Sequence, residues 1–320
     1  MTAVEVLGIG RDFVSSGRRV TALEQVDFTV DEGEIVALLG ENGAGKTTLT
    51  KILATLLLPS RGTARVFGVD VVARPQEVRR HQSVVFGGER GFYQRLSARE
   101  NLRFFAMLNG ASPRGLRELV ERSLERAGLA DAAGRAVETY SRGMRQRLHL
   151  AVGFATSPRL MLLDEPTIGL DPVEAARLRA EISGLRDQGV TILLTSHHLL
   201  DVEELADRVV ALHKGRVVED MPLADFTRRA GFAAVLRVAG RGAPPAPRVC
   251  KGIRVRGRNQ AEGTGERQGT WTLEIEIEEW GTVSLGEISA LLDGCAVTDF
   301  DVTPARLEDS FRRLYETPRP

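Results

Sequence analysis

Residues 40–48 of the chain read Gly40-Glu41-Asn42-Gly43-Ala44-Gly45-Lys46-Thr47-Thr48. They fit the phosphate-loop pattern GxxxxGK(S/T) and directly follow an apolar, strand-like run, Ile35–Leu39. A glycine-rich turn lets successive backbone NH groups close around a phosphate, whereas side chains at Gly40, Gly43 or Gly45 would obstruct them. The stretch therefore predicts a nucleoside triphosphate site between a strand and a helix.

The end of this loop supplies a positive charge and a hydroxyl. Lys46 is placed to reach the β- and γ-phosphates, and the Thr47 hydroxyl is placed to bind Mg²⁺. The helix that should begin here adds the positive end of its dipole. Its apolar face is predicted to carry Leu49, Ile52, Leu53 and Leu56.

A second apolar run, Leu160–Leu163, ends in two carboxylates, Asp164 and Glu165. This pattern is typical of a central parallel strand buried on both faces. Charges there are costly unless they are paired or bind a cation, and consecutive strand residues point to opposite faces. We therefore expect Asp164 to hold Mg²⁺, usually through water, and Glu165 to polarise an attacking water as general base.

A third apolar run, Val190–Thr195, leads to Ser196 and His197. Open α/β sheets bind ligands at the carboxyl ends of their strands, so the phosphate loop, the acidic pair and His197 should converge on one crevice.

Residues 140–148 read Tyr140-Ser141-Arg142-Gly143-Met144-Arg145-Gln146-Arg147-Leu148. With the preceding motifs, this segment resembles the signature motif of ABC transporter nucleotide-binding subunits, in the variant form of the ABC-2 exporter branch. The resemblance covers most of residues 1–225. It implies an α/β fold with a phosphate-loop (RecA-like) ATPase core, an antiparallel β subdomain, a helical signature subdomain and a small C-terminal α+β domain.

The same resemblance implies roles for residues outside the strand ends. Phe13, in Arg11-Asp12-Phe13, is expected to stack on adenine, and Asp171, in Gly169-Leu170-Asp171-Pro172, is expected at a dimer seam. His197 becomes the switch histidine that contacts the γ-phosphate. His198 is its alternative by one register, and the preceding Thr195-Ser196 pair favours His197. Binding of ATP by the phosphate loop involves Gly40, Glu41, Asn42, Gly43, Ala44, Gly45, Lys46, Thr47 and Thr48. Contact with ATP held by the opposite subunit involves Ser141, Arg142, Gly143 and Met144.

One segment departs from the family pattern. Most relatives have a glutamine after a strand such as Val84-Val85-Phe86, where this chain has Gly87-Gly88-Glu89-Arg90-Gly91. Glu89 and Gln94 are the candidates to replace that side chain, and Gly-rich versions do occur in the ABC-2 branch. The following residues, 92–102, resemble the segment that leads into the helical subdomain and would grip a cytoplasmic helix of the membrane partner.

Composition predicts a cytoplasmic chain that acts peripherally on the inner face of the cell membrane. The 320 residues carry no net charge, which gives no indication of a nucleic-acid partner. No apolar run approaches the roughly 18 residues that span a bilayer, and the first residues do not read as a secretion signal. The pore is therefore expected to be a separate permease polypeptide.

The chain has two cysteines, Cys250 and Cys295. They are too few and too isolated for a disulfide framework or a zinc site.

Two domains are predicted. An ATP-binding cassette covers residues 1–225, with its helical subdomain at about 92–155 and a hairpin within 207–218 that turns at Lys214-Gly215. A C-terminal accessory α+β domain covers 226–320, and its residues 307–311 resemble the end of that domain in ABC-2 subunits. Within it we expect a loop or linker at 241–270, strands at 271–278 and 296–302, and helices at 285–292 and 304–315.

These features predict an ATP-hydrolysing subunit of an ABC-2 exporter of the drug, antibiotic or sodium type. It would use ATP and Mg²⁺ and would pair with a second copy of itself or with a related ATPase subunit. The alternatives are a non-transport ABC ATPase of ribosomes or DNA repair, a GTPase, or an ATP-binding regulatory subunit with weak hydrolysis. One chain with one cassette, and no long insertion between Lys46 and Asp164, argues against the first. A GTPase would carry an Asn/Thr-Lys-x-Asp motif, which occurs at none of the lysines of the chain. The missing glutamine leaves the weakly hydrolysing regulatory subunit as an open alternative.

Overall fold

The structure is a computed structural model that describes residues 1–15, 18–86, 91–155, 157–245, 252–261, 269–279 and 285–316. Gly87–Arg90, where the family glutamine is missing, and Cys250 lie outside these residues. The chain divides into two compact units, Met1–Pro222 and Leu223–Pro320. The division falls three residues before the boundary expected from the sequence.

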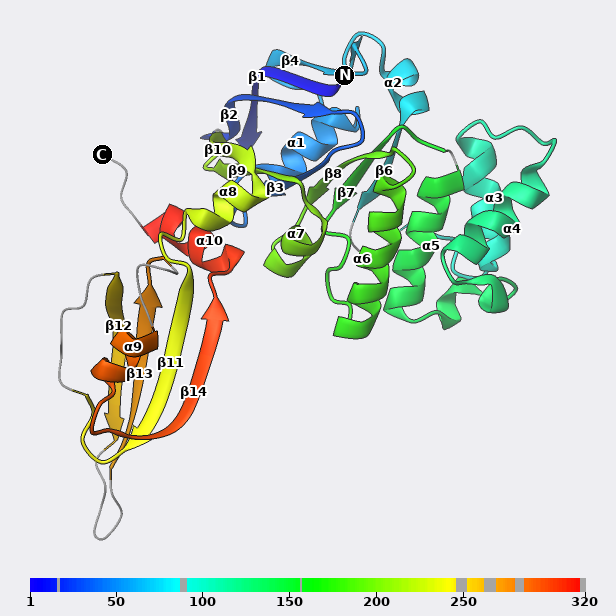
Figure 1. Cartoon of the computed structure of the whole chain (residues 1–320). Helices are drawn as coiled ribbons and strands as arrows, with labels where there is room; N and C mark the ends of the chain where they lie inside the picture. Colours follow the sequence, from blue (N-terminus) through cyan, green and yellow to red (C-terminus); the bar gives the residue numbers. More distant parts are fainter. Residues whose placement is uncertain are drawn as a thin grey trace. The chain divides into compact units, whose positions relative to one another are not determined.

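The first unit is organised around a six-stranded sheet (Figure 1). Its strand order is β10 (Arg216–Pro222), β9 (Arg208–His213), β3 (Ile35–Leu39), β8 (Thr191–Thr195), β7 (Leu160–Asp164) and β6 (Gln82–Phe86). Every neighbouring pair is parallel except β10 with β9. All residues of β3, β7 and β8 are buried, as their apolar runs predicted, and their carboxyl ends lie at one edge.

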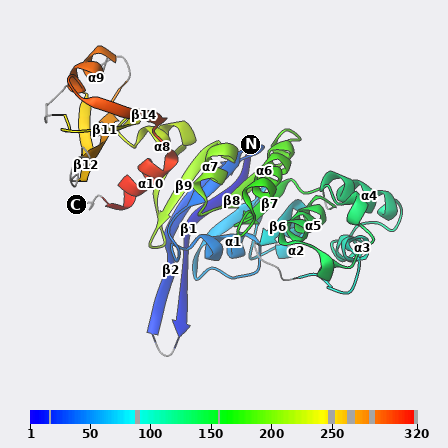
Figure 2. The same ribbon diagram turned by 90° about the horizontal axis from the view of Figure 1, so that it is seen from below.

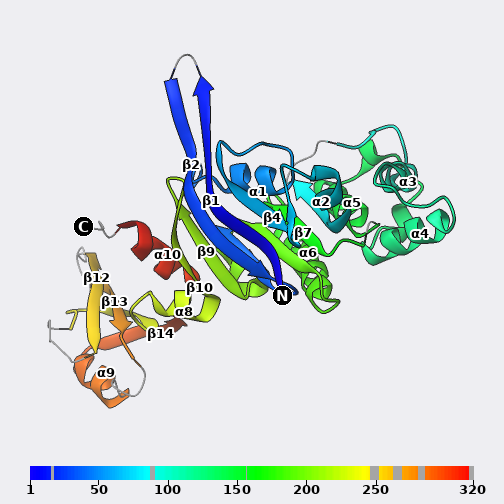
Figure 3. The same cartoon turned by 90° about the horizontal axis from the view of Figure 1, so that it is seen from above.

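A smaller antiparallel sheet faces the first across one helix. Its order is β2 (Arg18–Asp31), β1 (Thr2–Ser15), β4 (Arg61–Val66) and β5 (Val69–Asp70). Helix α1 (Lys46–Leu53) lies between the two sheets and shares one apolar core with both of them. Figure 3 shows the paired ends of β1 and β2 projecting beyond the rest of the sheet. This arrangement confirms the predicted α/β core and antiparallel β subdomain.

A helical group has its own core and lies beside α2 (Pro75–His81) and β6 (Figure 2). It contains α3 (Ala98–Leu108), α4 (Leu116–Arg126), two single 3-10 turns (Ala130–Ala132 and Val137–Thr139) and α5 (Arg142–Ala155). A capping box between Ser97 and Glu100 starts α3. Helices α6 (Pro172–Arg186) and α7 (Leu199–Leu205) cover the face of the large sheet opposite α1. Among the described residues, no helix combines the length and the apolar character needed to cross a membrane.

In its described residues, the second unit is an antiparallel sheet with three helices. The strand order is β12 (Ile253–Ala261), β13 (Thr270–Ile277), β11 (Ala234–Arg241) and β14 (Ala296–Pro304). Its helices are α8 (Leu223–Arg228), α9 (Leu285–Leu291) and α10 (Leu307–Glu316). Alternate residues of β13, namely Trp271, Leu273, Ile275 and Ile277, form a core with Ile288 and Leu291 of α9.

Three sequence predictions need correction. Residues 241–270 are not one continuous loop, because 253–261 form β12, which pairs with β13. The last helix starts at Leu307 instead of residue 304. Helix α1 ends at Leu53, since Thr55 takes a positive φ of 60°, and this leaves Leu56 59% exposed instead of packed on an apolar face.

The hairpin turn between β9 and β10 occurs at the predicted dipeptide. His213 pairs with Arg216, and the two residues between them have positive φ, 47° at Lys214 and 79° at Gly215. Two positive φ values are typical of the type I′ turn, whose twist matches that of the strands it joins. A Cβ on Gly215 would lie 2.8 Å from the carbonyl oxygen of Ala22.

We therefore expect Gly215→Ala to lower the free energy of unfolding by roughly 2–4 kcal/mol, through both backbone strain and the clash. Gly33→Ala is the matched control, because Gly33 has φ 77° but open space around its Cβ position. That variant should lose only about 1–2 kcal/mol. Urea denaturation of both variants measures the difference, and equal losses would show that the contact with Ala22 has no effect.

Candidate functional site

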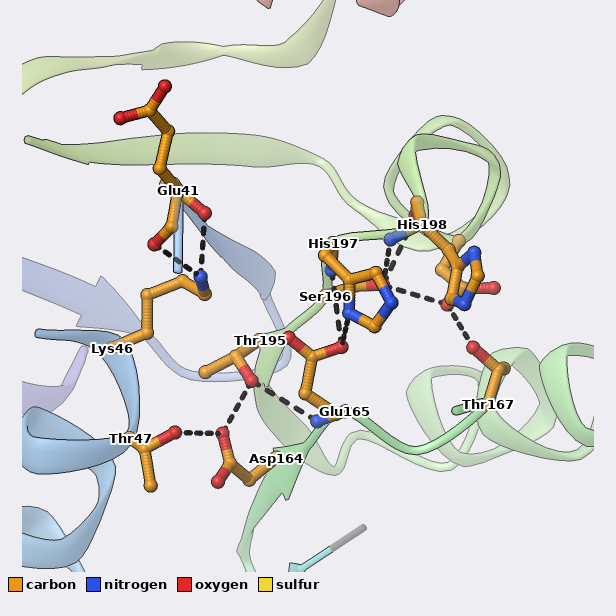
Figure 4. Close-up of polar contacts among 12 residues, drawn as sticks. Glu41, Lys46, Thr47, Asp164, Glu165, Thr167, Thr195, Ser196, His197 and His198 are labelled. Atoms are coloured by element: carbon orange, nitrogen blue, oxygen red, sulfur yellow. Dashed lines mark hydrogen bonds and ion pairs between the residues drawn. The ribbon is translucent and has the colours of Figure 1, made fainter. Parts of the chain in front are cut away.

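The phosphate loop joins β3 to α1 and is closed by its own lysine (Figure 4). Lys46 Nζ donates to the carbonyl oxygens of Gly40, at 2.6 Å, and Glu41, at 3.1 Å. The side chain is buried, and burial lowers the pKa of Lys46 against the raising influence of Glu165 and Asp164. The Lys46 ammonium group is thus held inside the loop by two neutral carbonyl oxygens. Phosphate oxygens could replace them, and the new hydrogen bonds would be stronger because both partners would be charged.

Contacts with distant parts of the chain explain why two positions of the phosphate loop require glycine, which the sequence alone did not show. A Cβ on Gly40 would lie 2.5 Å from the carbonyl oxygen of Leu212, and one on Gly45 would lie 2.7 Å from that of Ala22. Gly45 also has φ 108° where it begins α1. Gly43 has open space around its Cβ position and a φ of 84°. The turn at Gly215 supports this loop, because its NH donates to the Ala44 carbonyl oxygen at 3.0 Å.

Asp164 lies at the end of β7 among hydroxyl groups. Its Oδ1 accepts hydrogen bonds from Thr195 Oγ1, at 2.6 Å, and from Thr47 Oγ1, at 3.2 Å. Thr195 is the residue opposite Asp164 in the β7–β8 pair. The predicted meeting of Thr47 and Asp164 is therefore present, and Thr195 joins them.

These oxygens suit Mg²⁺. The ion prefers octahedral oxygen ligands at about 2.0–2.1 Å, so two adjacent ligand oxygens lie about 3 Å apart. The Thr47 and Asp164 oxygens are 3.2 Å apart. Among the described residues there is no group of three His, Cys, Asp or Glu side chains that could hold a metal.

Glu165 follows in a left-handed conformation, with φ 56°. For a residue with a Cβ this costs roughly 1–2 kcal/mol, so surrounding contacts must maintain it. Its NH donates to the carbonyl oxygen of Thr195, at 3.0 Å, and also to Thr195 Oγ1, at 3.1 Å. The carboxylate Oε2 contacts His197 Nδ1 and accepts from the His197 NH at 3.2 Å (Figure 4). The strained turn thus directs a carboxylate at a histidine across the sheet edge.

The structure distinguishes the two adjacent histidines. His197 contacts Glu165 with both its ring and its backbone NH, whereas the His198 NH donates to Ser196 Oγ at 2.9 Å. Their rings lie 4.3 Å apart at 37°. His197 is therefore the histidine brought to the acidic pair, as the sequence favoured.

The signature residues have local contacts instead. Ser141 caps α5, with Oγ accepting from the Met144 NH at 3.2 Å. A Cβ on Gly143 would lie 2.8 Å from Glu174 Oε2, and one on Gly169 would overlap the Arg142 guanidinium. Within the described part of the chain, no hydrogen bond joins Ser141–Met144 to the phosphate loop.

Two other predicted positions also lack contacts with the phosphate loop among the described hydrogen bonds. Asp171 caps α6, with Oδ1 accepting from the NH groups of Val173 and Glu174 at 3.0 Å each. Phe13 lies in β1 with its side chain 37% exposed, and the Arg11 guanidinium lies 4.7 Å from its ring centre. Stacking of Phe13 on adenine and contact of Asp171 across a dimer seam stay predictions.

Comparison with known proteins identifies the family. The ABC transporter family model matches residues 23–168. The ABC transporter ATP-binding protein NatA of Bacillus subtilis (strain 168) is 40% identical over 208 residues, which are 65% of this chain and 85% of NatA. The chain belongs to the ABC transporter family. It is an ATPase of that family, as predicted.

Two further comparisons agree. The daunorubicin resistance ATP-binding protein DrrA2 of Streptomyces coeruleorubidus is 35% identical to this ABC ATPase over 295 residues, 92% of this chain and 90% of DrrA2. A solved structure of an ATP-binding subunit of an ABC transporter is 32% identical with a TM-score of 0.63, and the match covers 72% of this chain and 93% of the other. The predicted fold class is confirmed.

Thr195 links both acids, although no role was predicted for it from the sequence. The available signal was a hydroxyl residue at the end of an otherwise apolar strand, next to the predicted switch histidine. A buried hydroxyl in such a place needs partners. The Thr195 hydroxyl has two partners, because it donates to Asp164 Oδ1 and accepts from the Glu165 NH. The Thr195 carbonyl accepts from the same NH.

We expect Thr195→Val in this ABC ATPase to lower kcat by roughly 10- to 100-fold, since hydrogen bonds to charged groups are worth about 1.5–3 kcal/mol. Thr191→Val is the matched control on the same strand, where the buried hydroxyl accepts from the Gly33 NH at 3.0 Å. Both variants should lose similar stability in thermal unfolding. Steady-state ATP hydrolysis should fall only for Thr195→Val, and an equal fall in both would contradict the assignment.

Proposed function

We propose that this ABC ATPase energises an ABC-2 type exporter by hydrolysing ATP with Mg²⁺ at the edge of its six-stranded sheet. The observation that carries the proposal is the Glu165–His197 contact beside the Asp164–Thr47 pair. A phosphate cradle, oxygen ligands for a cation and a candidate base are thus gathered at adjacent strand ends. The relative named for daunorubicin resistance supports assignment to an exporter.

The site residues would divide the work. Lys46 would exchange its carbonyl partners for β- and γ-phosphate oxygens. Thr47 and Asp164 would hold Mg²⁺, which neutralises phosphate charge when it is bound. Glu165 would accept a proton from the attacking water, and His197 would keep that carboxylate oriented and contact the γ-phosphate.

We further propose that the working unit is a dimer, either of two copies or of one copy with a related ATPase subunit. The support is the placement of Ser141 just before α5, where none of the described hydrogen bonds joins it to the phosphate loop of its own chain. A helix start with a free hydroxyl proton is suited to an anion. ATP bound on one subunit would then be covered by Ser141, Gly143 and neighbouring residues of the other, and hydrolysis would reopen the pair.

The helical group offers a surface for a membrane permease. A hollow of about 550 Å³ lies between α2 and β6 on one side and α3 and α5 on the other, lined by Phe92, Phe105 and His149 among others. Exposed apolar side chains nearby include Tyr93, at 52%, and Phe104, at 41%, whose rings are 5.0 Å apart. Aromatic side chains of this kind are typical anchors for a partner helix. The chain would thereby be held on the cytoplasmic face of the membrane.

The assigned base is tested by Glu165→Gln. We expect turnover to fall by roughly 10² to 10⁴, the range for removal of a general base, while ATP still binds. The side-chain shape and a hydrogen bond to His197 are kept. Glu77→Gln, at a half-exposed carboxylate on α2 paired with Arg74, is the control and should hydrolyse ATP normally. Turnover of Glu165→Gln at the wild-type level would refute the assignment.

The permease surface is tested by isolating the tagged chain from gently solubilised membranes. An integral membrane protein should accompany the wild type and be lost with Phe104→Ser, because the exposed ring would anchor the partner. Leu7→Ser removes an exposed apolar side chain on β1 and should keep the partner. Both variants should bind ATP normally in a titration. Recovery with ribosomes would support a non-transport ATPase instead.

A further inference from the structure

A buried polar cluster joins the segments that follow Glu165 and precede His197. Its members are Asp201 of α7, Arg179 of α6, Thr167 and Ser196. Asp201 and Ser196 are fully buried, and Thr167 and Arg179 are 4% and 7% exposed. A carboxylate in such a place is costly unless each oxygen is satisfied, so its partners indicate what it holds.

Both carboxylate oxygens of Asp201 have partners. Oδ1 accepts from Arg179 Nη1 at 3.0 Å. Oδ2 accepts from Ser196 Oγ at 2.9 Å and from Thr167 Oγ1. One buried charge is therefore balanced by a guanidinium on one side and bonded to two hydroxyls on the other.

The two residues that carry these hydroxyls lie close in sequence to Glu165 and His197. Thr167 is two residues after Glu165 and leads toward Asp171, while Ser196 immediately precedes His197. Figure 4 shows Thr167 and Ser196 on the same side of the site as the two histidines. Glu165 has a positive φ and its turn has to be maintained by contacts. Asp201 holds the loop after Glu165 and the loop before His197 at a single point.

We propose that Asp201 is a positioning residue for ATP hydrolysis, which fixes the Glu165 turn against the switch-histidine loop through Thr167 and Ser196. The inference rests on the proposed function of Glu165 as base. Thr167 also leads toward Asp171, which caps α6. The Asp201 carboxylate therefore links the start of α6 to the Glu165–His197 pair within one chain.

The chain contains a matched control for a purely structural role. Glu204 also pairs with Arg179, through Nε at 2.5 Å, and belongs to the segment that begins at α7. Among the described hydrogen bonds, Glu204 pairs with Arg179 and contacts neither Thr167 nor Ser196. A substitution at either carboxylate therefore removes one pairing with Arg179. Only a substitution at Asp201 also removes the hydrogen bonds to Thr167 and Ser196 in the two loops.

The test compares Asp201→Asn with Glu204→Gln in the full-length chain, by steady-state ATP hydrolysis, nucleotide titration and thermal unfolding. We expect Asp201→Asn to lower kcat by about ten-fold or more with KM and ATP affinity within about two-fold of wild type. Glu204→Gln should leave both constants unchanged. Equal effects of the two substitutions on kcat, or a change in KM alone for Asp201→Asn, would overturn the proposal.

Two milder variants keep the test decisive if Asp201→Asn does not fold. Thr167→Val and Ser196→Ala each remove one hydroxyl and leave the Asp201–Arg179 pair intact. Each should lower kcat at constant KM, and the double variant should cost less than the product of the two single losses, because they share one acceptor. Wild-type kcat in both single variants would overturn the proposal. Failure of the proposed function itself would appear separately, as normal turnover in Glu165→Gln.

Discussion

A polar group at the end of a strand buried on both faces must find its partner within the protein or in a bound ligand. Asp164 and Thr195 lie at such ends and bond to each other at 2.6 Å. Thr195 also receives the Glu165 NH, which holds that residue in its strained turn. The parallel strands thus help to determine where the site lies, because the carboxyl ends of β3, β7 and β8 bring these groups to one edge.

The central elements were predictable because each had only one structure compatible with its pattern. Five-residue apolar runs bounded by polar residues are too short for buried helices, and they form β3, β7 and β8 at the expected residues. The turn at Lys214-Gly215 follows from the positive φ that glycine accepts easily. Convergence of Lys46, Asp164 and His197 follows from parallel strands alone, since all their carboxyl ends meet at one edge.

The features that could not be predicted from the sequence depend on contacts between residues far apart in the chain. Residues 253–261 carry arginine and glycine in place of a strong apolar pattern, and they become a strand because β13 offers an edge to pair with. Gly40 is required by the carbonyl of Leu212, which no local pattern shows. The buried carboxylate of Asp201 reads in the sequence as an ordinary acid in an amphipathic helix, and its partners Thr167 and Arg179 become neighbours only after α6 and α7 pack on the sheet.

The caps of α5 and α6 differ in a way that bears on a shared site. Ser141 uses an oxygen lone pair to accept from the Met144 NH, so its hydroxyl proton is still available for an anion. Asp171 caps α6 with a carboxylate, which accepts hydrogen bonds but donates none when ionised. A phosphate could therefore be bound at the start of α5 but would be repelled by the cap of α6. Of the two helix starts, only that of α5 is suited to covering the ATP of a partner, and Asp171 is suited to receiving a donor group from the partner's protein surface.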